Sequence, residues 1–247
     1  MSDVKNSSLA TDLVSYWELE EASGTRVDSH GSNDLADIDT VAQGTGKIGN
    51  CADMNGSSEK LRITNASQTG LDITDDISIA GWVKWDTQDN SSQYVIASKW
   101  HSISGGRSYL FFTQSGNLNF ATSGSGNWTG NVFSEAKTFS TGTWYHLAAT
   151  YDVSAGTMQL FVDGVQLGSD NTGMETSIYD GTADFTIGAD HSTSYTDGQF
   201  DEVGVWNKVL TSTEVTALYN SGDGIPYDAG GGGGGVVNPT LLGLGRI

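Results

Sequence analysis

One stretch of the chain decides its fold: Trp144-Tyr-His-Leu-Ala-Ala-Thr-Tyr-Asp152, followed after a short turn by Met158-Gln-Leu-Phe-Val-Asp-Gly-Val-Gln-Leu167. In the first segment, residues 145, 147 and 149 fall on one face and the residues between them on the other, which is the period of a β-strand. In the second segment, Asp163-Gly164 separates two such runs and favours the two-residue type I′ turn of a hairpin. The stretch therefore predicts paired strands within an all-β sandwich.

Length and composition agree with this architecture. The 247 residues are enough for one large all-β domain, since sandwiches reach such lengths without dividing. The chain has 33 Gly but only 2 Pro, which is typical of short strands joined by tight turns. Cys51 is the single cysteine, so an intrachain disulfide is excluded and a buried, unreactive thiol is expected.

The formal net charge of −19 excludes a general nucleic-acid-binding protein, because phosphate contacts require clustered Lys and Arg. Three interpretations of the acidity remain open: solubility in a salty or calcium-containing medium, oxygen-rich Ca²⁺ sites, and self-repulsion in a displayed protein. Residues 1–8 lack the apolar segment of a signal peptide. No membrane span is expected, since no run of about 18 apolar residues occurs.

The chain is expected to have three parts: a polar lead-in over residues 1–12, the sandwich domain over residues 13–227, and a Gly-rich linker with a tail over residues 228–247. About twelve to fourteen strands are expected in the domain. One short helix is predicted, because Thr211-Ser-Thr-Glu214 has the spacing of a capping box and Val215, Leu218 and Tyr219 follow on one face.

The tail differs from the rest of the chain. Six glycines at 230–235 precede an apolar segment without acidic residues. One interpretation is a disordered end, and the other is a flexible tether whose apolar residues dock on a protein partner, for example as an added strand. The docking residues would be Val236, Val237, Leu241, Leu242, Leu244 and Ile247.

Four segments carry a family resemblance: Leu13-Val-Ser-Tyr-Trp-Glu-Leu19 with Ser23-Gly-Thr-Arg-Val-Asp-Ser-His-Gly31; Ile77-Ser-Ile-Ala-Gly-Trp-Val-Lys84; the opening hairpin; and Phe185-Thr-Ile-Gly188 with Phe200-Asp-Glu-Val-Gly-Val-Trp-Asn207 and the helix. In this order they resemble the laminin-G-like, concanavalin-A-like jelly roll of bacterial and phage surface proteins. The resemblance implies an all-β jelly roll of two antiparallel sheets packed face to face, with one short C-terminal helix. The extended tail after Gly230 lies outside the resemblance. Members include lectins, adhesion modules and glycoside hydrolases, so the fold alone does not decide the function.

Catalysis is not expected. Glycoside hydrolysis on this fold needs two carboxylates facing one cleft, about 5 to 5.5 Å apart in retaining enzymes. Asp201 and Glu202 are neighbours and should point to opposite faces of a strand, while Glu18 and Glu20 share a face but lie at the start of the fold. The His residues have no metal-pair spacing, and His146 is expected to be a packed structural residue.

Calcium is the one cofactor considered. The resemblance implies Ca²⁺ near the loop rims, and residues 28–33 form an oxygen-rich loop. A structural ion held by Asp28, Asn33 and Asp201 is predicted, with Asp53 and Asn55 as a second possibility. The alternative is that these are turn residues that make local backbone hydrogen bonds.

A sugar site is predicted from aromatic and imidazole side chains in or beside Gly/Ser-rich loops. Its ligand-binding residues are Trp100, His101, Trp128 and Tyr195, with Trp128 the best candidate for an exposed ring. Tyr109 and His191 lie in comparable positions. The alternative is that these rings belong to the core or its rim.

Together these features predict a non-enzymatic binding or structural module displayed on a surface. The favoured form is a virion-associated protein, a phage capsid decoration, cement or tail protein, which docks through its C-terminal tail. Its partners would be a capsid or other assembly subunit, glycans, or both, and it would be a homo-oligomer or part of a larger assembly. The alternative is a carbohydrate-binding adhesin or lectin domain of a secreted bacterial protein, and a glycoside hydrolase is a minor alternative. The expected location is the virion surface or the extracellular space.

Overall fold

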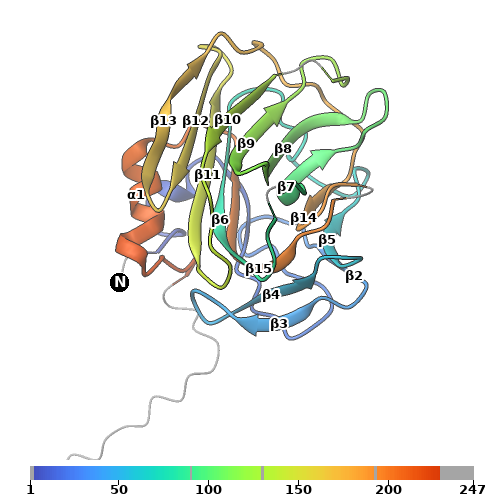
Figure 1. Cartoon of the computed structure of the whole chain (residues 1–247), viewed down its shortest axis with the longest axis vertical. Coiled ribbons are helices and arrows are strands. Elements are labelled where there is room, and N and C mark those ends of the chain that lie inside the picture. Colours follow the sequence, from blue (N-terminus) through green and yellow to red (C-terminus); the bar gives the residue numbers. More distant parts are fainter. Residues whose placement is uncertain (1–2, 90, 129–130, 192–193, 229–247) are drawn as a thin grey trace, which may run out of the picture.

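The computed structural model describes residues 3–89, 91–128, 131–191 and 194–228. Two antiparallel sheets pack face to face, which confirms the predicted sandwich (Figure 1). The eight-stranded sheet has the order β13 (Val165–Thr172), β12 (Thr157–Val162), β11 (Tyr145–Asp152), β6 (Ile77–Trp85), β15 (Asp197–Trp206), β4 (Asn50–Asn55), β3 (Ala42–Thr45), with β1 (Leu13–Trp17) also paired to β15. The seven-stranded sheet has the order β10 (Val132–Ala136), β9 (Asn117–Thr122), β8 (Arg107–Gln114), β7 (Tyr94–Trp100), β14 (Phe185–Ile187), β5 (Lys60–Ile63), β2 (Ala36–Ile38).

The opening stretch forms the predicted hairpin. Strands β11 and β12 pair with Leu147 opposite Val162 and Ala149 opposite Leu160. The turn to β13 has φ of 51° at Asp163 and 76° at Gly164, the left-handed conformation that a type I′ turn needs at both positions. The alternating pattern in the sequence therefore corresponds to the two faces of a real strand pair.

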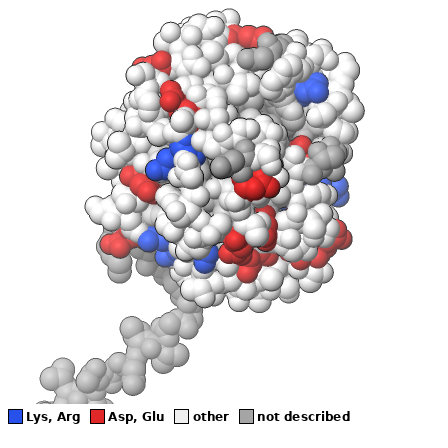
Figure 2. Space-filling model, in the orientation of Figure 1, with Lys and Arg blue, Asp and Glu red and all other residues white. Residues whose placement is uncertain are grey.

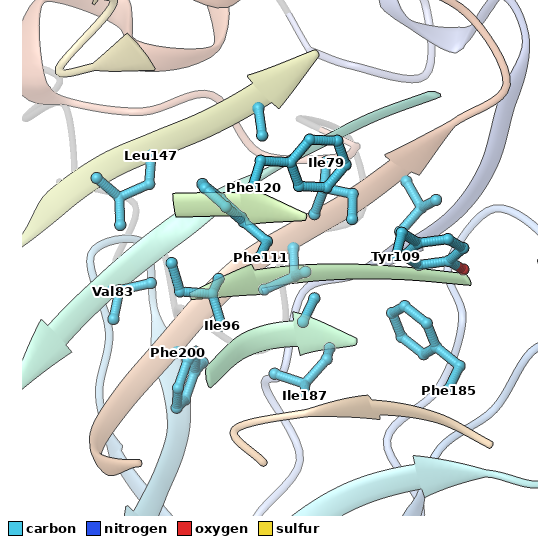
Figure 3. Close-up of a cluster of buried hydrophobic side chains, with 14 of the residues drawn as sticks. Ile79, Val83, Ile96, Tyr109, Phe111, Phe120, Leu147, Phe185, Ile187 and Phe200 are labelled. Atoms are coloured by element: carbon cyan, nitrogen blue, oxygen red, sulfur yellow. The ribbon is translucent and has the colours of Figure 1, made fainter. Parts of the chain in front are cut away.

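Large apolar side chains fill the space between the sheets (Figure 3). Ile79, Leu147 and Phe200 from the eight-stranded sheet are fully buried, as are Phe111 and Phe120 from the seven-stranded sheet. Each such side chain contributes about 1.5–3 kcal/mol of stability on burial. This core holds the two sheets together.

The strands that sequence reasoning missed lie at the sheet edges. Strands β3, β10 and β2 are outermost in their sheets, and β13 extends to Thr172, beyond the Leu167 end of the predicted segment. Residues of β3 are exposed or half-buried along its whole length. An edge strand that faces solvent needs no apolar alternation, so its sequence carries no strand signal.

The outer face of the eight-stranded sheet is covered by both ends of the described chain. Helix α1 (Ser212–Tyr219), the short helices η1 (Ser8–Ala10) and η2 (Asn220–Gly222), and the segments around them lie along this side. Val4 is fully buried, and the Leu9 carbonyl accepts a hydrogen bond of 2.7 Å from Trp206 Nε1. Residues 3–12 were expected to precede the domain, but they are part of it.

Helix α1 begins with the capping box that the sequence predicts. Thr211 Oγ1 accepts from the Glu214 backbone N–H at 3.2 Å, and Glu214 Oε2 accepts from the Thr211 backbone N–H at 2.9 Å. Val215 and Leu218 are buried against the sheet. No helix within the described ranges is long and apolar enough to span a membrane.

His146 and Cys51 are packed residues, as expected. The His146 ring lies 5.3 Å from the Trp82 ring and 6.3 Å from the Tyr219 ring and is 2% exposed. Burial lowers the pKa of His146 to about 3, so the ring is neutral in the folded protein. Burial also raises the pKa of the Cys51 thiol to about 12, which suppresses the reactive thiolate.

Two adjacent carboxyl groups are buried where β15 bulges. The bulge lies between Asp201 and Gly204, and Glu202 has a φ of 50°. Strict strand alternation predicted opposite faces for the pair, whereas Asp201 is fully buried and Glu202 is 4% exposed. Burial raises the pKa of both groups well above the ordinary range, and the charge of Asp201 raises the pKa of Glu202 further.

This pair predicts a stability that depends on pH. A carboxyl group whose pKa is raised by folding stabilises the protein below its unfolded pKa, and this stabilisation is lost as the pH rises through the folded pKa. We expect the free energy of unfolding of the wild-type protein to fall, relative to that of Glu202→Gln, as the pH rises above 4.5, the ordinary pKa of Glu. His146 is present in both proteins, so its contribution cancels in this comparison. Glu202→Gln should reduce this slope, since each unit of raised pKa corresponds to about 1.4 kcal/mol.

Urea unfolding at several pH values measures this slope. Glu135→Gln is a matched control, because Glu135 is half-buried on the edge strand β10. An equal slope in the wild-type protein and Glu202→Gln would contradict the prediction. Below pH 6.5 the buried His146 acts in the opposite sense, because its lowered pKa removes stability as the pH falls towards about 3.

Candidate functional site

Two tryptophans meet at one end of the seven-stranded sheet, on its outer face. Trp100 ends β7 and packs there against Val95, Leu110 and Phe112. Trp128 contacts the Trp100 ring edge to face, with 5.9 Å between ring centroids. Trp100 is 4% exposed, whereas Trp128 is 60% exposed. The inner ring thus supports an outer ring that faces solvent.

The loop that carries Trp128 is tied to its neighbours. Ser123 Oγ donates to the Asn127 carbonyl at 2.5 Å, and Gly126 has a φ of 77°. A Cβ at Gly126 would lie 2.6 Å from the Tyr179 ring and 2.8 Å from the Gly105 Cα. Such close approach needs glycine, so three loops pack together beside the exposed indole (upper right in Figure 1).

The loops that pack here carry two more exposed apolar side chains. Ile103, in the loop between β7 and β8, is 49% exposed, and Tyr179 is 38% exposed. Large exposed side chains that gather in one place are characteristic of interaction sites, whereas single ones are ordinary. This group gives the end of the sheet an amphipathic surface.

Imidazole rings continue this surface. The segment after β14 folds back across the sheet, since Ser98 Oγ donates to the Ala189 carbonyl at 3.2 Å and the His191 backbone N–H donates to the Trp100 carbonyl at 3.3 Å. The His101 and His191 rings stack with 3.9 Å between centroids. Burial and the neighbouring His101 lower the pKa of His191.

Lys60 connects the imidazoles to Tyr195. Its Nζ donates to the His191 carbonyl at 3.2 Å and lies 5.4 Å from the centroid of the Tyr195 ring. Burial and the charge of Arg62 lower the pKa of this lysine. We call the set Trp100, His101, Arg107, Trp128, His191, Tyr195 and Lys60 the aromatic surface.

The structure brings together the four residues predicted to bind a ligand. Trp100, His101, Trp128 and Tyr195 all belong to the aromatic surface, although ligand binding itself stays a prediction. Tyr109 does not belong to it, because its ring is fully buried in the core and its hydroxyl donates to the Leu71 carbonyl at 2.9 Å.

Sequence reasoning overlooked two basic members of this surface. Arg107 begins β8 opposite Trp100, and its guanidinium carbon lies 5.8 Å from the Trp100 ring centroid. Lys60 begins β5, far from Trp100 along the chain. Pairing between distant strands brings them here, and the sequence does not reveal such pairing. The one local indication was that Arg107 follows Trp100 by seven residues, across a Gly-containing loop.

The predicted calcium ligands Asp28 and Asp201 accept hydrogen bonds from different segments. Asp28 Oδ1 accepts from the backbone N–H groups of Tyr16, His30 and Gly31, and its Oδ2 accepts from that of Asn33. Asp201 Oδ2 instead accepts from the backbone N–H groups of the loop at 47–48. In the described part of the chain, no group of three or more His, Cys, Asp or Glu side chains could hold a metal ion.

Asn33 and Asn55 also act as local capping residues. Asn33 Nδ2 donates to Ser15 Oγ at 2.7 Å, and its Oδ1 accepts from the Thr69 backbone N–H at 2.7 Å. Asn55 Oδ1 accepts from the backbone N–H groups of residues 57 and 58. These contacts are the local hydrogen bonds of the turn interpretation, and calcium binding stays a prediction.

The carboxylates considered for catalysis are bound to other groups or lie on the other sheet. Glu18 Oε2 accepts from Ser29 Oγ at 2.7 Å, and Glu20 Oε2 accepts from the Asn50 backbone and side chain at 2.9 Å each. Asp201 and Glu202 belong to the eight-stranded sheet. Carboxyl groups near the aromatic surface include those of Asp184 and Asp190, whose charges act to raise the pKa of Lys60 against the lowering by burial. Glu175 Oε2 also accepts from the Gly124 backbone N–H, in the loop that carries Trp128, at 2.7 Å.

Several solved structures share this fold at low sequence identity. A Trypanosoma rangeli sialidase has a TM-score of 0.64 and 17% identity over 88% of this chain and 34% of its own. Domain 4 of AbnA, an extracellular arabinanase from Geobacillus stearothermophilus in complex with arabinotriose, has a TM-score of 0.59 and 18% identity over 83% of this chain and 97% of its own. The ligand-binding domain of botulinum neurotoxin serotype D, in complex with N-acetylneuraminic acid, has a TM-score of 0.63 and 14% identity over 86% and 52%.

The chain thus spans about a third of the sialidase and about half of the neurotoxin domain. At these identities the likeness concerns the fold alone. No curated protein matches the sequence significantly. The laminin-G-type model described as the concanavalin A-like lectin/glucanase superfamily matches residues 55–216. With the two-sheet jelly roll in place, the chain belongs to the concanavalin A-like lectin/glucanase superfamily.

Proposed function

We propose that this protein is a non-catalytic carbohydrate-binding module whose binding site is the aromatic surface. One observation carries the proposal: Trp128 presents an indole that is 60% exposed, on a loop packed against Trp100 and Tyr179. A fixed aromatic ring can stack against the apolar face of a sugar without losing much conformational entropy. His101 and Tyr195 offer polar groups beside it.

Other proteins of this fold support the choice of ligand. The arabinanase domain was solved with arabinotriose, and the neurotoxin domain with N-acetylneuraminic acid. Catalysis is not part of the proposal, since the carboxyl pair with raised pKa lies on the eight-stranded sheet and not at the aromatic surface.

Display on a virion or in the extracellular space remains a proposal, as do homo-oligomers and protein partners. One feature favours display: Ile225 and Tyr227 pack on the outer face of the eight-stranded sheet, opposite the sheet that bears the aromatic surface. Lys5 Nζ holds Asp228 at 2.8 Å on that side. A partner that bound the following segment there would leave the sugar site facing outward. The proposed docking residues, from Val236 to Ile247, lie outside the described residues.

Removal of Trp128 tests the carbohydrate proposal. We expect wild-type protein to bind a subset of glycans on an array, and Trp128→Ala to lose binding by about tenfold or more, since stacking of one ring contributes about 1–2 kcal/mol. Trp144→Ala is the matched control, because Trp144 is half-buried and precedes β11 on the other sheet. Equal loss in both variants, or no binding by the wild-type protein, would refute the proposal.

Deletion of residues 229–247 tests docking. The deletion should leave the melting temperature unchanged, because the domain core ends at Tyr227. Particle association or self-assembly should be lost, as measured by sedimentation with particles or by light scattering. Unchanged assembly after the deletion would contradict a docking role for the tail.

A thermal melt tests calcium. An ion held by Asp28, Asn33 and Asp201 should raise the melting temperature in millimolar Ca²⁺ relative to a chelator. An unchanged melting temperature would favour the turn interpretation, in which the oxygens of Asp28 accept backbone hydrogen bonds. An ion that binds selectively to the native state would raise the apparent stability. A Ca²⁺-dependent rise that Asp28→Asn abolishes would support the predicted site.

A further inference from the structure

Basic side chains gather at the aromatic surface of an otherwise acidic protein. The chain has 11 Lys and Arg against 30 Asp and Glu. Figure 2 shows one face of the molecule, on which Lys and Arg are scattered singly while carboxylates gather most densely at lower right. The seven-stranded sheet contributes Lys60 and Arg62 from β5 and Arg107 from β8, two strands that are separated by β7 and β14. The stacked rings of His101 and His191 lie between these groups in the chain of contacts, since Lys60 Nζ donates to the His191 carbonyl.

Arg107 lies within reach of a sugar stacked on Trp128. Both residues contact the same Trp100 ring, Arg107 with its guanidinium carbon 5.8 Å from the centroid and Trp128 with its own centroid at 5.9 Å. Arg107 Nε is buried and has no hydrogen-bond acceptor among the residues that the structure describes. A buried donor without an acceptor costs free energy, so this guanidinium is not satisfied within the described fold. The Arg107 side chain is only half-buried, and its terminal nitrogens carry the N–H donors that would meet an incoming acceptor.

Two further nitrogens at this surface are buried without a hydrogen-bond acceptor in the described part of the chain. His191 Nδ1 and Arg62 Nε are also buried and lack an acceptor within the described ranges. Arg62 Nε, Arg107 Nε and His191 Nδ1 therefore all lie at the seven-stranded sheet and have no acceptor among the described residues. The two arginines stay charged and act only as donors, so they suit an anion. His191, whose pKa burial lowers, can donate from one ring nitrogen as the neutral imidazole.

The nearby carboxylates neutralise this cluster only in part. Asp184 lies 3.7 Å from Arg62, a long ion-pair distance, and Asp190 acts on Lys60. The charge of Arg62 lowers the pKa of Lys60, and the charges of Lys60 and Arg62 lower that of His191. The basic groups thus repel one another, and a bound negative charge would relieve this repulsion.

We propose that the glycan recognised here carries an anionic group, a carboxylate or a sulfate, which Arg107 binds beside the sugar ring stacked on Trp128. This inference rests on the proposed carbohydrate-binding function and specifies its ligand class. Arginine suits the role, because its planar guanidinium pairs with carboxylate and sulfate oxygens through two parallel hydrogen bonds. Lys60 and His191 extend the positive surface.

The test compares matched oligosaccharides that differ only in one residue: neutral, carboxylated with a uronic or sialic acid, and sulfated. Titration calorimetry should show that an anionic form binds at least about tenfold more tightly than the neutral form, which is the value of one charge-assisted hydrogen bond. This preference should shrink when the salt concentration rises to about 0.5 M, because added ions screen the charges. The carboxylated and sulfated arms distinguish the two sources of charge.

Substitution of Arg107 tests whether this residue causes the preference for an anionic glycan. Arg107→Gln should reduce affinity for the anionic glycan about tenfold or more while it leaves affinity for the neutral glycan nearly unchanged. Lys84→Gln is the matched control, because Lys84 also lies over an indole, that of Trp144, with its Nζ 5.1 Å from the ring. If Arg107→Gln fails to fold, Arg107→Lys and the salt dependence of the wild-type protein give the same information.

The outcomes separate the two proposals. Equal wild-type affinity for neutral and anionic glycans overturns the anionic preference but leaves carbohydrate binding intact, provided that Trp128→Ala still abolishes it. An anionic preference that Arg107→Gln does not change overturns the assigned role of Arg107. Absence of binding to every glycan overturns both proposals.

Discussion

The apolar contact between the two sheets is the interaction on which the rest of the structure depends. Ile79, Leu147 and Phe200 meet Phe111 and Phe120 across the sandwich, and all are fully buried. With one cysteine and no described metal cluster, this contact holds the domain together. Because the side chains alternate with period two, burial of one face of each strand directs the other face outward.

The outer faces of the two sheets are covered to different extents. Helix α1, the N-terminal segment and Tyr227 cover the eight-stranded sheet, with Trp206 donating to Leu9 beneath them. The segment at 189–191 crosses the outer side of the seven-stranded sheet, and a small apolar cluster that includes Trp100 lies on this sheet. This unequal covering explains why a ring such as Trp128 can be exposed at the seven-stranded sheet while it packs against the buried Trp100. It also separates the proposed sugar site from the exit of the tail.

Burial at β15 shows a second constraint of the sandwich. The bulge at Asp201 and Glu202 lets β15 pair with β6 along one edge and with β4 and then β1 along the other. Asp201 Oδ2 accepts two backbone hydrogen bonds from the loop at 47–48, which ties that loop to the sheet. The buried acid is thus a structural element, although its residue type and its position in a strand resemble those of a catalytic or metal-binding group.

Local sequence determined the elements whose signal is short-range: the hairpin at Asp163-Gly164, the capping box at Thr211, and the inner strands with apolar alternation. It also identified the exposed Trp128 and its neighbours, because aromatic residues in Gly/Ser-rich loops are unusual. Only the tertiary structure decided the edge strands, the burial of residues 3–12, and the capping role of Asp28. It alone brought Lys60 and Arg107 to the same surface as Trp100 and His191. These features depend on pairing between distant strands, and a strand's own sequence contains no record of which strand lies beside it.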